Sequence, residues 1–375
     1  MLRLVHSSFY GTHGEMEGQL LCHESFLKLC KLATEQAVMG LVSQGLINSG
    51  VRLEHDDALN LYALHQSIRL QNHVMDEAVV RLCNDWNDAG IRILIIKGQT
   101  LAALYPDPGL RQSGDIDFLI HPEDWEKAMT YVREVLKMNI NDSNSEKHVE
   151  WVSRGVQYEM HKFLTTFAYP KHHHYWEKVV LPEIWNHPYT IRINGCEVPT
   201  LAPTYNVLYT FVHIFYHLIL DGIGMRQFCD WARILSVFSP HKADSLASID
   251  TERKVNTELL ERHLKGIGLR KAFTGLGAIL TEYIGLPEKD FPFEITAEDL
   301  ARGPQLFRNM ITMGNLGHNV PYKNKPGIKH GIEHLSRITK QAQTFYHYAP
   351  VEVWWRIPNM FKWWSIKIKR LIYKG

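Results

Sequence analysis

The sequence predicts a mixed α+β fold, in which a small sheet is flanked by helices and lies between two helical regions of the chain. Apolar residues recur every three or four positions from Glu24 to about Trp86 and again after Pro203, which is the period of a helix. Short β-branched or alternating runs between these regions are bounded by turn residues, as strands are. The 375 residues also exceed the roughly 250–300 at which one hydrophobic core stops growing. We therefore divide the chain into an N-terminal helical region (1–89), a mixed core (90–201), a second helical region (202–350) and a tail (351–375).

The composition predicts a globular protein of the cytoplasm. Hydrophobic residues make up 45% and charged residues 22% of the chain, so most of it should fold. A formal net charge of +1 provides no overall attraction to nucleic acid or to an anionic membrane. The five cysteines are scattered and form no CxxC pair, which favours a reducing compartment. No apolar stretch approaches the roughly 18–20 residues that span a bilayer, and the N-terminus has no signal-peptide core.

The elements of the mixed core are predicted in order. Turn residues at 87–90 precede a mostly β-branched run at 91–96, which suits a buried strand. A helix from Gln99 to Tyr105 follows and ends at a turn rich in proline. The run 115–120 begins with alternating polar and apolar residues, as a strand with one polar face does, and acidic residues open a further helix at 121–124.

Two hairpins and a long helical region complete the prediction. One hairpin joins 149–152 to 156–161 around Arg154-Gly155, and another is marked by Asn194-Gly195, the strongest short-range hairpin signal. Helical periodicity then continues from Pro203 to about Ile284. Prolines indicate a looser region beyond it: Pro287, Pro292, Pro304, Pro321 and Pro326.

Two carboxylates on the strand 115–120 are the first candidates for chemistry. Asp115 and Asp117 are two residues apart and so point to the same side of a strand. Like charges at that spacing repel, and Mg²⁺ is the usual cation that compensates them where phosphate is handled. The alternative for this pattern alone is a solvated strand edge.

The neighbouring residues favour a site that binds both metal and phosphate. Lys97-Gly98-Gln99 follows a strand and opens a helix, where backbone N–H groups can hold phosphate oxygens. Arg111 offers a bidentate fork to a phosphate, with a loop ion pair as its alternative. Glu159 lies in the middle of a strand, where an inward carboxylate is costly unless it binds something.

Several further residues are candidates for the wall that would hold a second substrate. His161 shares the face of Glu159 and would position an acceptor, orient the glutamate or serve the structure alone. His213 and His217 have the spacing of two ligands on one helix face, but no adjacent Glu completes a zinc-protease pattern, so a packed or acceptor-side pair is favoured. Arg226 and Asp230 are predicted to form an ion pair on one helical face.

Two segments, one rich in histidine and one rich in aromatic residues, have more than one interpretation. The run at 172–174, three histidines, would either bind metal adventitiously or, as is more typical, mark a solvated loop. The tail mixes aromatic and basic side chains, which suits a membrane interface, stacked nucleic-acid bases or a C-terminal helix docked on the core. These tail residues are Trp354, Trp355, Trp363, Trp364 and Tyr373 with Arg356, Lys362, Lys367, Lys369, Arg370 and Lys374.

Four motifs together carry a resemblance to a known family. They are Ile95-Ile96-Lys97-Gly98, Tyr105-Pro106 with Arg111, Gly114-Asp115-Ile116-Asp117-Phe118-Leu119, and Tyr158-Glu159-Met160-His161. In this order and spacing they resemble the uncharacterised bacterial nucleotidyltransferase family of the polymerase-β-like superfamily. The resemblance continues more loosely from Val198 to Leu235, through Leu201-Ala202-Pro203-Thr204, and covers about half of the chain.

The resemblance implies a small polymerase-β-like sheet and a two-metal transfer of a nucleoside monophosphate. A nucleoside triphosphate would be attacked by a hydroxyl of a small molecule, a protein or an RNA, and pyrophosphate would leave. Asp115, Asp117 and Glu159 would hold two Mg²⁺ ions, with Mn²⁺ as the substitute. The nucleotide would be bound by Lys97, Gly98, Gln99, Arg111 and Gly114. The acceptor side would include His161, His213, His217, Arg226 and Asp230.

One residue departs from the pattern of the superfamily. The phosphate turn usually carries Gly-Ser or Gly-Gly, whereas this chain has Gly98-Gln99. The longer side chain would still donate to phosphate but changes the pose of a triphosphate. A second hypothesis therefore stands beside the enzyme: a binding protein that keeps the fold and recognises a nucleotide or partner without transfer.

Overall fold

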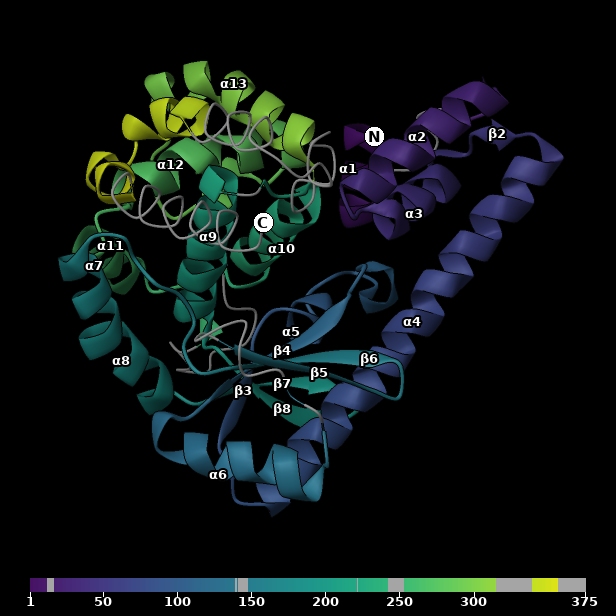
Figure 1. Ribbon diagram of the computed structural model, residues 1–375. Helices are drawn as coiled ribbons and strands as arrows, with labels where there is room; N and C mark the ends of the chain where they lie inside the picture. The colour runs from purple at the N-terminus through teal and green to yellow at the C-terminus, as the bar shows by residue number, and fades with distance from the viewer. Residues whose placement is uncertain are drawn as a thin grey trace, which may run out of the picture.

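One mixed sheet of six strands lies at the centre of the molecule (Figure 1). The computed structural model describes residues 1–11, 17–138, 140, 148–220, 222–241, 253–314 and 339–356. The strands are β1 Leu20–Leu21, β2 Arg52–Leu53, β3 Ile93–Ile95, β4 Asp115–Ile120, β5 His148–Ser153, β6 Val156–His161, β7 Tyr189–Ile193 and β8 Cys196–Thr200. The first two form a small parallel pair of their own, and the sequence did not predict them.

Helices make up most of the rest of the described structure. The α-helices are α1 Leu2–Tyr10, α2 His23–Glu35, α3 Met39–Ser49, α4 His55–Asp88, α5 Gln99–Ala102, α6 Trp125–Thr130, α7 Pro170–Tyr175, α8 Leu181–Asn186, α9 Pro203–Leu220, α10 Met225–Val237, α11 Thr257–Gly266, α12 Arg270–Ile279 and α13 Ala297–Met313. Stretches of π-helix at Tyr131–Val135, Trp176–Val180 and Leu280–Ile284 continue α6, α7 and α12. The mixed α+β class predicted from the sequence is confirmed.

The sheet has the strand order β5-β6-β4-β3-β8-β7. Its three antiparallel pairs are β3–β4, β5–β6 and β7–β8, while β4–β6 and β3–β8 are parallel. Both predicted hairpins are present, and their turn residues have the positive φ angles that a tight hairpin requires: 51° and 77° at Arg154-Gly155, 48° and 79° at Asn194-Gly195. The parallel β4–β6 pair matters most, because it places two motifs that are far apart in the chain side by side.

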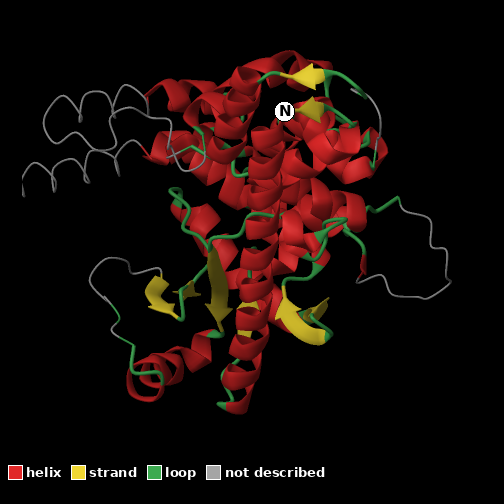
Figure 2. Cartoon of the chain, turned by 90° about the vertical axis from the view of Figure 1, so that its right-hand side faces the viewer, coloured by secondary structure: helices red, strands yellow, loops and turns green. Residues whose placement is uncertain are grey.

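The two faces of the sheet pack against different partners. On β4, alternate residues Ile116, Phe118 and Ile120 enter a core that also contains Trp86 of α4. Helix α4 is 34 residues long and reaches from the N-terminal helices to this face, as Figures 1 and 2 show. The opposite face carries Leu119 toward the larger core under α9 and α10. The carboxylates of β4 lie on this second face.

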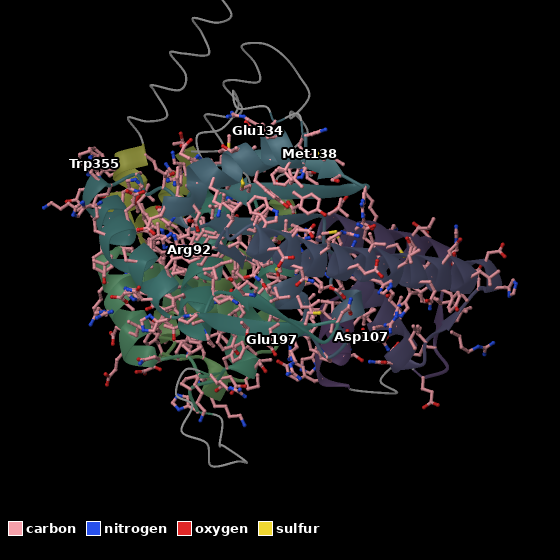
Figure 3. All side chains as sticks on the ribbon, turned by 90° about the horizontal axis from the view of Figure 1, so that it is seen from below. Arg92, Asp107, Glu134, Met138, Glu197 and Trp355 are labelled. Atoms are coloured by element: carbon pink, nitrogen blue, oxygen red, sulfur yellow. The ribbon has the colours of Figure 1, made fainter. Side chains whose placement is uncertain are left out.

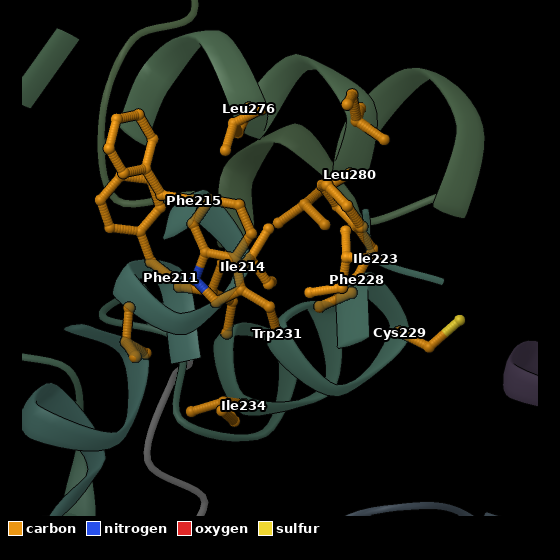
Figure 4. Close-up of a cluster of buried hydrophobic side chains, with 14 of the residues drawn as sticks. Phe211, Ile214, Phe215, Ile223, Phe228, Cys229, Trp231, Ile234, Leu276 and Leu280 are labelled. Carbon is orange, nitrogen blue, oxygen red and sulfur yellow. The ribbon is translucent and has the colours of Figure 1, made fainter. Parts of the chain in front are cut away.

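Helices α9 and α10 form the centre of the larger core. Figure 4 shows Phe211 and Ile214 of α9 packed with Phe228 and Trp231 of α10, and all four side chains are fully buried. This packing holds the polar side of α9 at a defined position above the sheet. Tyr209, His213 and His217, which follow one another every four residues on that side of α9, are therefore held by a closely packed helix.

The region after Ile284 is more regular than the prolines indicated. Residues 297–313 form helix α13, which begins with a capping box between Thr296 and Asp299. Pro304 lies inside this helix, so its presence does not mark a loop. The prediction of a looser region is wrong at this position, because a cap and a buried apolar face outweigh the one backbone hydrogen bond that a proline removes. Pro321 and Pro326 lie outside the described residues.

The first part of the tail docks on the core. The carboxylate of Glu352 is buried and accepts backbone N–H bonds from Ala168 at 2.9 Å and Tyr169 at 3.3 Å. Trp354 and Trp355 remain exposed, and Figure 3 shows Trp355 at the edge of the molecule. The tail residues from 357 onward, with most of its basic and aromatic side chains, lie outside the described residues. None of the helices in the described ranges combines the length and apolar character that a bilayer-crossing segment needs.

The three histidines at 172–174 are not in a loop. They lie on α7, and His172 is 3.4 Å from a carboxylate oxygen of Glu352 through its Nδ1. The prediction of a solvated loop is wrong because the chain after Pro170 continues as a helix and uses His172 to contact the C-terminal segment.

Candidate active site

The turn between β3 and α5 has a backbone that only glycine adopts readily. Lys97 has φ 62°, and Gly98 has φ 53° with ψ −125°. A Cβ added to Gly98 would meet only the carbonyl oxygen of Asp115, at 3.5 Å. The glycine is therefore needed for its backbone angles and not for space. The turn lifts Lys97 from the end of β3 toward the carboxylates of β4.

This conformation predicts the effect of an alanine substitution. Gly98→Ala should lower the free energy of unfolding by about 1–3 kcal/mol, because an L-residue is strained in this region. Gly114→Ala is the matched control: that glycine has no positive φ, and its added Cβ meets nothing within 4 Å. Urea unfolding of both variants measures the difference. Equal midpoints for the two variants would contradict the role assigned to Gly98.

The parallel pairing of β4 with β6 brings the carboxylates together. In this register Asp117 faces Glu159 directly. Asp117 Oδ1 lies 2.9 Å from His161 Nε2 and 3.1 Å from Lys97 Nζ, and His161 Nε2 is 3.6 Å from Glu159 Oε2. One ligand atom from each of Asp117, Glu159 and His161 lies within 4.8 Å of the others. The three side chains are thus spaced to surround one cation.

The opposite charges of Asp117 and Lys97 offset the cost of burying each of them. Burial alone would raise the pKa of Asp117, which is only 4% exposed, but Lys97 and His161 outweigh it and hold this pKa well below its usual range. Burial disfavours the Lys97 charge, yet the negative charges led by Asp117 raise the pKa of Lys97 above its ordinary value. Both groups are therefore charged at neutral pH.

Asp115 lies beside this group but outside it. Among the described residues, neither set of ligand atoms within 4.8 Å includes Asp115. Burial, and then the charge of Asp117, raise the pKa of Asp115 from 3.8 to about 6. A divalent cation would relieve that repulsion, and two carboxylates with an imidazole form a donor set that suits one. The residues therefore fit a metal, with His161 as a ligand that the sequence did not predict.

The raised pKa of Asp115 predicts a pH-dependent stability. The folded state keeps the Asp115 proton up to about pH 6, whereas 3.8 is the ordinary value, so wild-type stability falls as pH rises between these values. Asn does not titrate. Asp115→Asn should therefore be more stable than wild type above pH 6 by on the order of 1–3 kcal/mol, and this difference should disappear below about pH 4.

Urea unfolding in EDTA across this pH range measures the effect. Added Mg²⁺ should narrow the difference above pH 6, because ligand that binds only the intact site stabilises wild type. A difference that is the same at pH 4 and pH 7.5 would show that Asp115 does not titrate as described.

A second group of candidate metal ligands shares Glu159. His148 and Glu150 on β5 have ligand atoms within 4.8 Å of a Glu159 oxygen. In the antiparallel β5–β6 register, Glu150 faces Glu159 and His148 faces His161. Sequence reasoning missed both residues, although each lies at the alternate-residue spacing of the β5 face.

Arg111 does not present its fork to a phosphate. Its Nε and Nη2 donate to the two carboxylate oxygens of Asp230 at 2.7 and 2.8 Å, and both side chains are buried. Tyr105 Oη donates to the same carboxylate at 2.7 Å. Helix α10 brings Asp230 to Arg111, and the guanidinium joins the sheet region to the helices. The phosphate contact of Arg111 stays a prediction, and the ion pair given as its alternative is present.

Arg226 is correspondingly not the partner of Asp230. Its Nη1 donates to the backbone carbonyl oxygen of Gln112 at 2.6 Å. Burial, followed by the charge of nearby Arg111, lowers the pKa of Arg226, while Asp230 and Asp115 act in the opposite direction. The predicted ion pair is replaced, and Arg226 instead provides positive charge near Asp115.

The side chain of Gln99 points away from the phosphate turn. It is 2% exposed, and its Nε2 donates to Asp76 Oδ1 of α4 at 2.5 Å. The amide is used in a buried contact with α4, and its donation to phosphate stays a prediction. Its length therefore does not obstruct the turn. Gly114 is exposed immediately before β4.

Tyr209 of α9 is a residue that sequence reasoning missed. Its side chain is 1% exposed, and its hydroxyl has no hydrogen-bond partner among the described residues. Burial raises its pKa to about 12; Lys97 opposes this, while Asp117 and Glu159 add to it. The hydroxyl is therefore in electrostatic reach of the carboxylates. A signal was present: Tyr209, His213 and His217 are spaced by four along one helix face.

Comparison with known proteins identifies the family. The model of a family described as uncharacterised nucleotidyltransferases matches residues 24–261, more than half of the chain. The chain belongs to this family. The resemblance drawn from the four motifs is confirmed at that level, and the match includes the β3–α5 turn, β4, β6 and α9.

Other similarities are weaker. An antigenic nucleotidyltransferase-like protein from Paracoccidioides brasiliensis is similar in structure, with a TM-score of 0.34 and 14% identity over 56% of this chain and 92% of that chain. No curated protein matches the sequence. The assignment of the chain to the nucleotidyltransferase family therefore rests on the family match alone.

Proposed function

We propose that the protein transfers a nucleoside monophosphate from a nucleoside triphosphate to an acceptor hydroxyl, and that Asp115, Asp117 and Glu159 form the centre of this reaction. The register of β4 and β6 is the observation that supports it most, because it sets Asp117 against Glu159 beside the Lys97-Gly98 turn. The family match makes nucleotide transfer the reaction class to which this geometry is applied.

Each residue has a proposed part in the transfer. Asp117 and Glu159, with Asp115 or His161, would hold divalent cations, Mg²⁺ or Mn²⁺, which stabilise the charge on the attacking and leaving oxygens. Lys97 Nζ lies 3.1 Å from Asp117 Oδ1, and we propose that it contacts a phosphate oxygen of the bound nucleotide. Glu159 is proposed to accept the proton of the acceptor hydroxyl.

The chemical balance of the step is simple. The acceptor oxygen forms a bond to the α-phosphorus, its proton passes to the base, and the bond from the α-phosphorus to the oxygen bridging to the β-phosphorus breaks. That electron pair leaves with pyrophosphate. The buried contact between Gln99 and Asp76 supports the enzyme over a binding protein, since the residue that departs from the superfamily pattern leaves the turn open.

Nucleotide binding and label transfer test the proposal in two stages. Calorimetric titration of the four common nucleoside triphosphates should show binding of at least one with Mg²⁺ or Mn²⁺ and none with EDTA. α-Labelled triphosphate should then transfer its label to a component of a small-molecule, protein or RNA fraction. Absence of binding to every triphosphate in the presence of either metal would refute the proposal.

A further inference from the structure

A cavity of about 180 Å³ lies against the polar side of α9. Its polar lining comes from three separate parts of the chain: Thr165 and Thr166 after β6, Tyr209, His213 and His217 of α9, and Arg356 near the end of the described chain. The ring centroids of the two histidines are 4.3 Å apart on successive turns, so both face the same space. Hydroxyl, imidazole and guanidinium groups thus converge on a volume that hydrophobic packing leaves open.

Arg356 is held in a way that points to an anionic ligand. Its guanidinium carbon lies 4.3 Å from the centroid of the Tyr216 ring. Its Nε is buried and has no hydrogen-bond partner among the described residues. A buried guanidinium N–H without an acceptor is costly, and a carboxylate or phosphate is the acceptor that matches its fork. Stacking on Tyr216 keeps the group in place for such a ligand.

The cavity adjoins the proposed centre of transfer. Thr165 and Thr166 come shortly after His161, the last residue of β6, so the strand that carries Glu159 leads directly into the cavity wall. Tyr209 also lines the cavity, and its buried hydroxyl has no partner among the described residues. The same hydroxyl is in electrostatic reach of Asp117 and Glu159. Tyr209 therefore connects the cavity with the carboxylates of the proposed centre of transfer.

We infer that this cavity is the acceptor site and that it takes a small hydroxyl-bearing molecule whose carboxylate or phosphate group binds Arg356, with the hydroxyl directed toward Tyr209. The inference rests on the proposed function and names the substrate class for it. A volume of 180 Å³ is below the roughly 300–1,000 Å³ of sites for drug-sized ligands, so the acceptor is correspondingly small. The hydroxyl oxygen forms the bond to the α-phosphorus, and pyrophosphate departs as described above.

Three small probes test this assignment on the full-length protein. Glycerate presents a carboxylate with hydroxyls, glycerol 3-phosphate presents a phosphate with hydroxyls, and glycerol is the uncharged control. Each is titrated into protein labelled with ¹³C at histidine Cε1, with the His213 and His217 signals assigned by substitution. At least one anion should shift both signals, and glycerol at tenfold higher concentration should not. Which anion binds distinguishes a carboxylate acceptor from a phosphate acceptor.

Variants separate a specific site from general attraction of anions. Arg356→Gln should weaken the anion at least tenfold, and Arg356→Lys, which keeps the charge but loses the fork, should weaken it less. Arg192→Gln is the control, since Arg192 is 77% exposed and pairs with Glu197 on the surface. If Arg356→Gln fails to fold, the Arg356→Lys variant and the contrast between anions and glycerol in wild type still test whether the cavity binds an anion through Arg356.

The outcomes are distinguishable from failure of the proposed function. Binding of a triphosphate with Mg²⁺ is measured on the same wild-type preparation. If the triphosphate binds while neither anion shifts His213 and His217, or while Arg356→Gln and Arg192→Gln bind the anion equally, the acceptor site is wrong and the transferase proposal stands. If no triphosphate binds, the proposed function itself has failed.

Discussion

Replacing Asp117 with Asn is expected to reduce nucleotide transfer by on the order of 10²–10³-fold. The neutral amide removes a charged metal ligand, and it leaves the charge of Lys97 without its carboxylate partner and His161 Nε2 without its carboxylate contact. Metal affinity should fall together with the transfer rate. Calorimetric titration of Mg²⁺ and the rate of label transfer from α-labelled triphosphate measure the two effects.

The control for Asp117→Asn is a carboxylate that has no role in the proposed centre. Glu197→Gln removes a side chain that is 51% exposed and pairs with Arg192, a surface contact worth less than about 1 kcal/mol. It should transfer at the wild-type rate. Asp117 would lose its proposed part if the Asn variant transferred as fast as Glu197→Gln, and a melting curve for each protein shows that the compared samples are folded.

The largest loss of stability is expected from Asp230→Asn. This change leaves Arg111, whose side chain is 4% exposed, without its charged partner in a buried environment. Breaking a buried pair by removing one member costs about 3–5 kcal/mol, because the remaining charge is uncompensated. The Tyr105 hydroxyl also loses its charged acceptor. Urea unfolding should show the midpoint falling at an unchanged slope.

Two comparisons sharpen this prediction. Glu24→Gln removes the Lys28 pair, whose carboxylate side chain is 79% exposed, and should change stability by less than about 0.5 kcal/mol. The double variant Arg111→Met with Asp230→Leu should recover part of the loss, since an apolar pair replaces two buried charges. If Asp230→Asn were as stable as Glu24→Gln, the pair with Asp230 would not hold Arg111 in place, and Arg111 would be available to contact phosphate.

Local signals in the sequence were sufficient for most of the sheet. Alternation along 115–120 placed Asp115 and Asp117 on one face, and the turns at Arg154-Gly155 and Asn194-Gly195 located both hairpins. These features depend on backbone angles and on the two-residue period of a strand, which near neighbours in the chain determine. They are therefore accessible without knowledge of the fold.

Partners chosen across the fold were not accessible in this way. Arg111 meets Asp230 across 119 positions of sequence, and Gln99 meets Asp76 across 23. Both were expected to contact phosphate because their residue types and local positions allow it. A buried polar group takes whichever partner the packing brings, and the docking of α10 and α4 decided both cases.

The candidate site also combines features that the local sequence predicts with features that depend on tertiary contacts. The sequence by itself determined that Asp115, Asp117 and Glu159 lie on strands and that a glycine turn follows a further strand at Lys97-Gly98, since these features follow from local periodicity and turn chemistry. Only the tertiary structure decided that β4 pairs in parallel with β6, so that Asp117 meets Glu159 and His161. Only the tertiary structure also assembled the cavity from α9, the residues after β6 and Arg356. Contacts between segments so distant in the chain depend on how whole faces are buried, and no local pattern encodes that outcome.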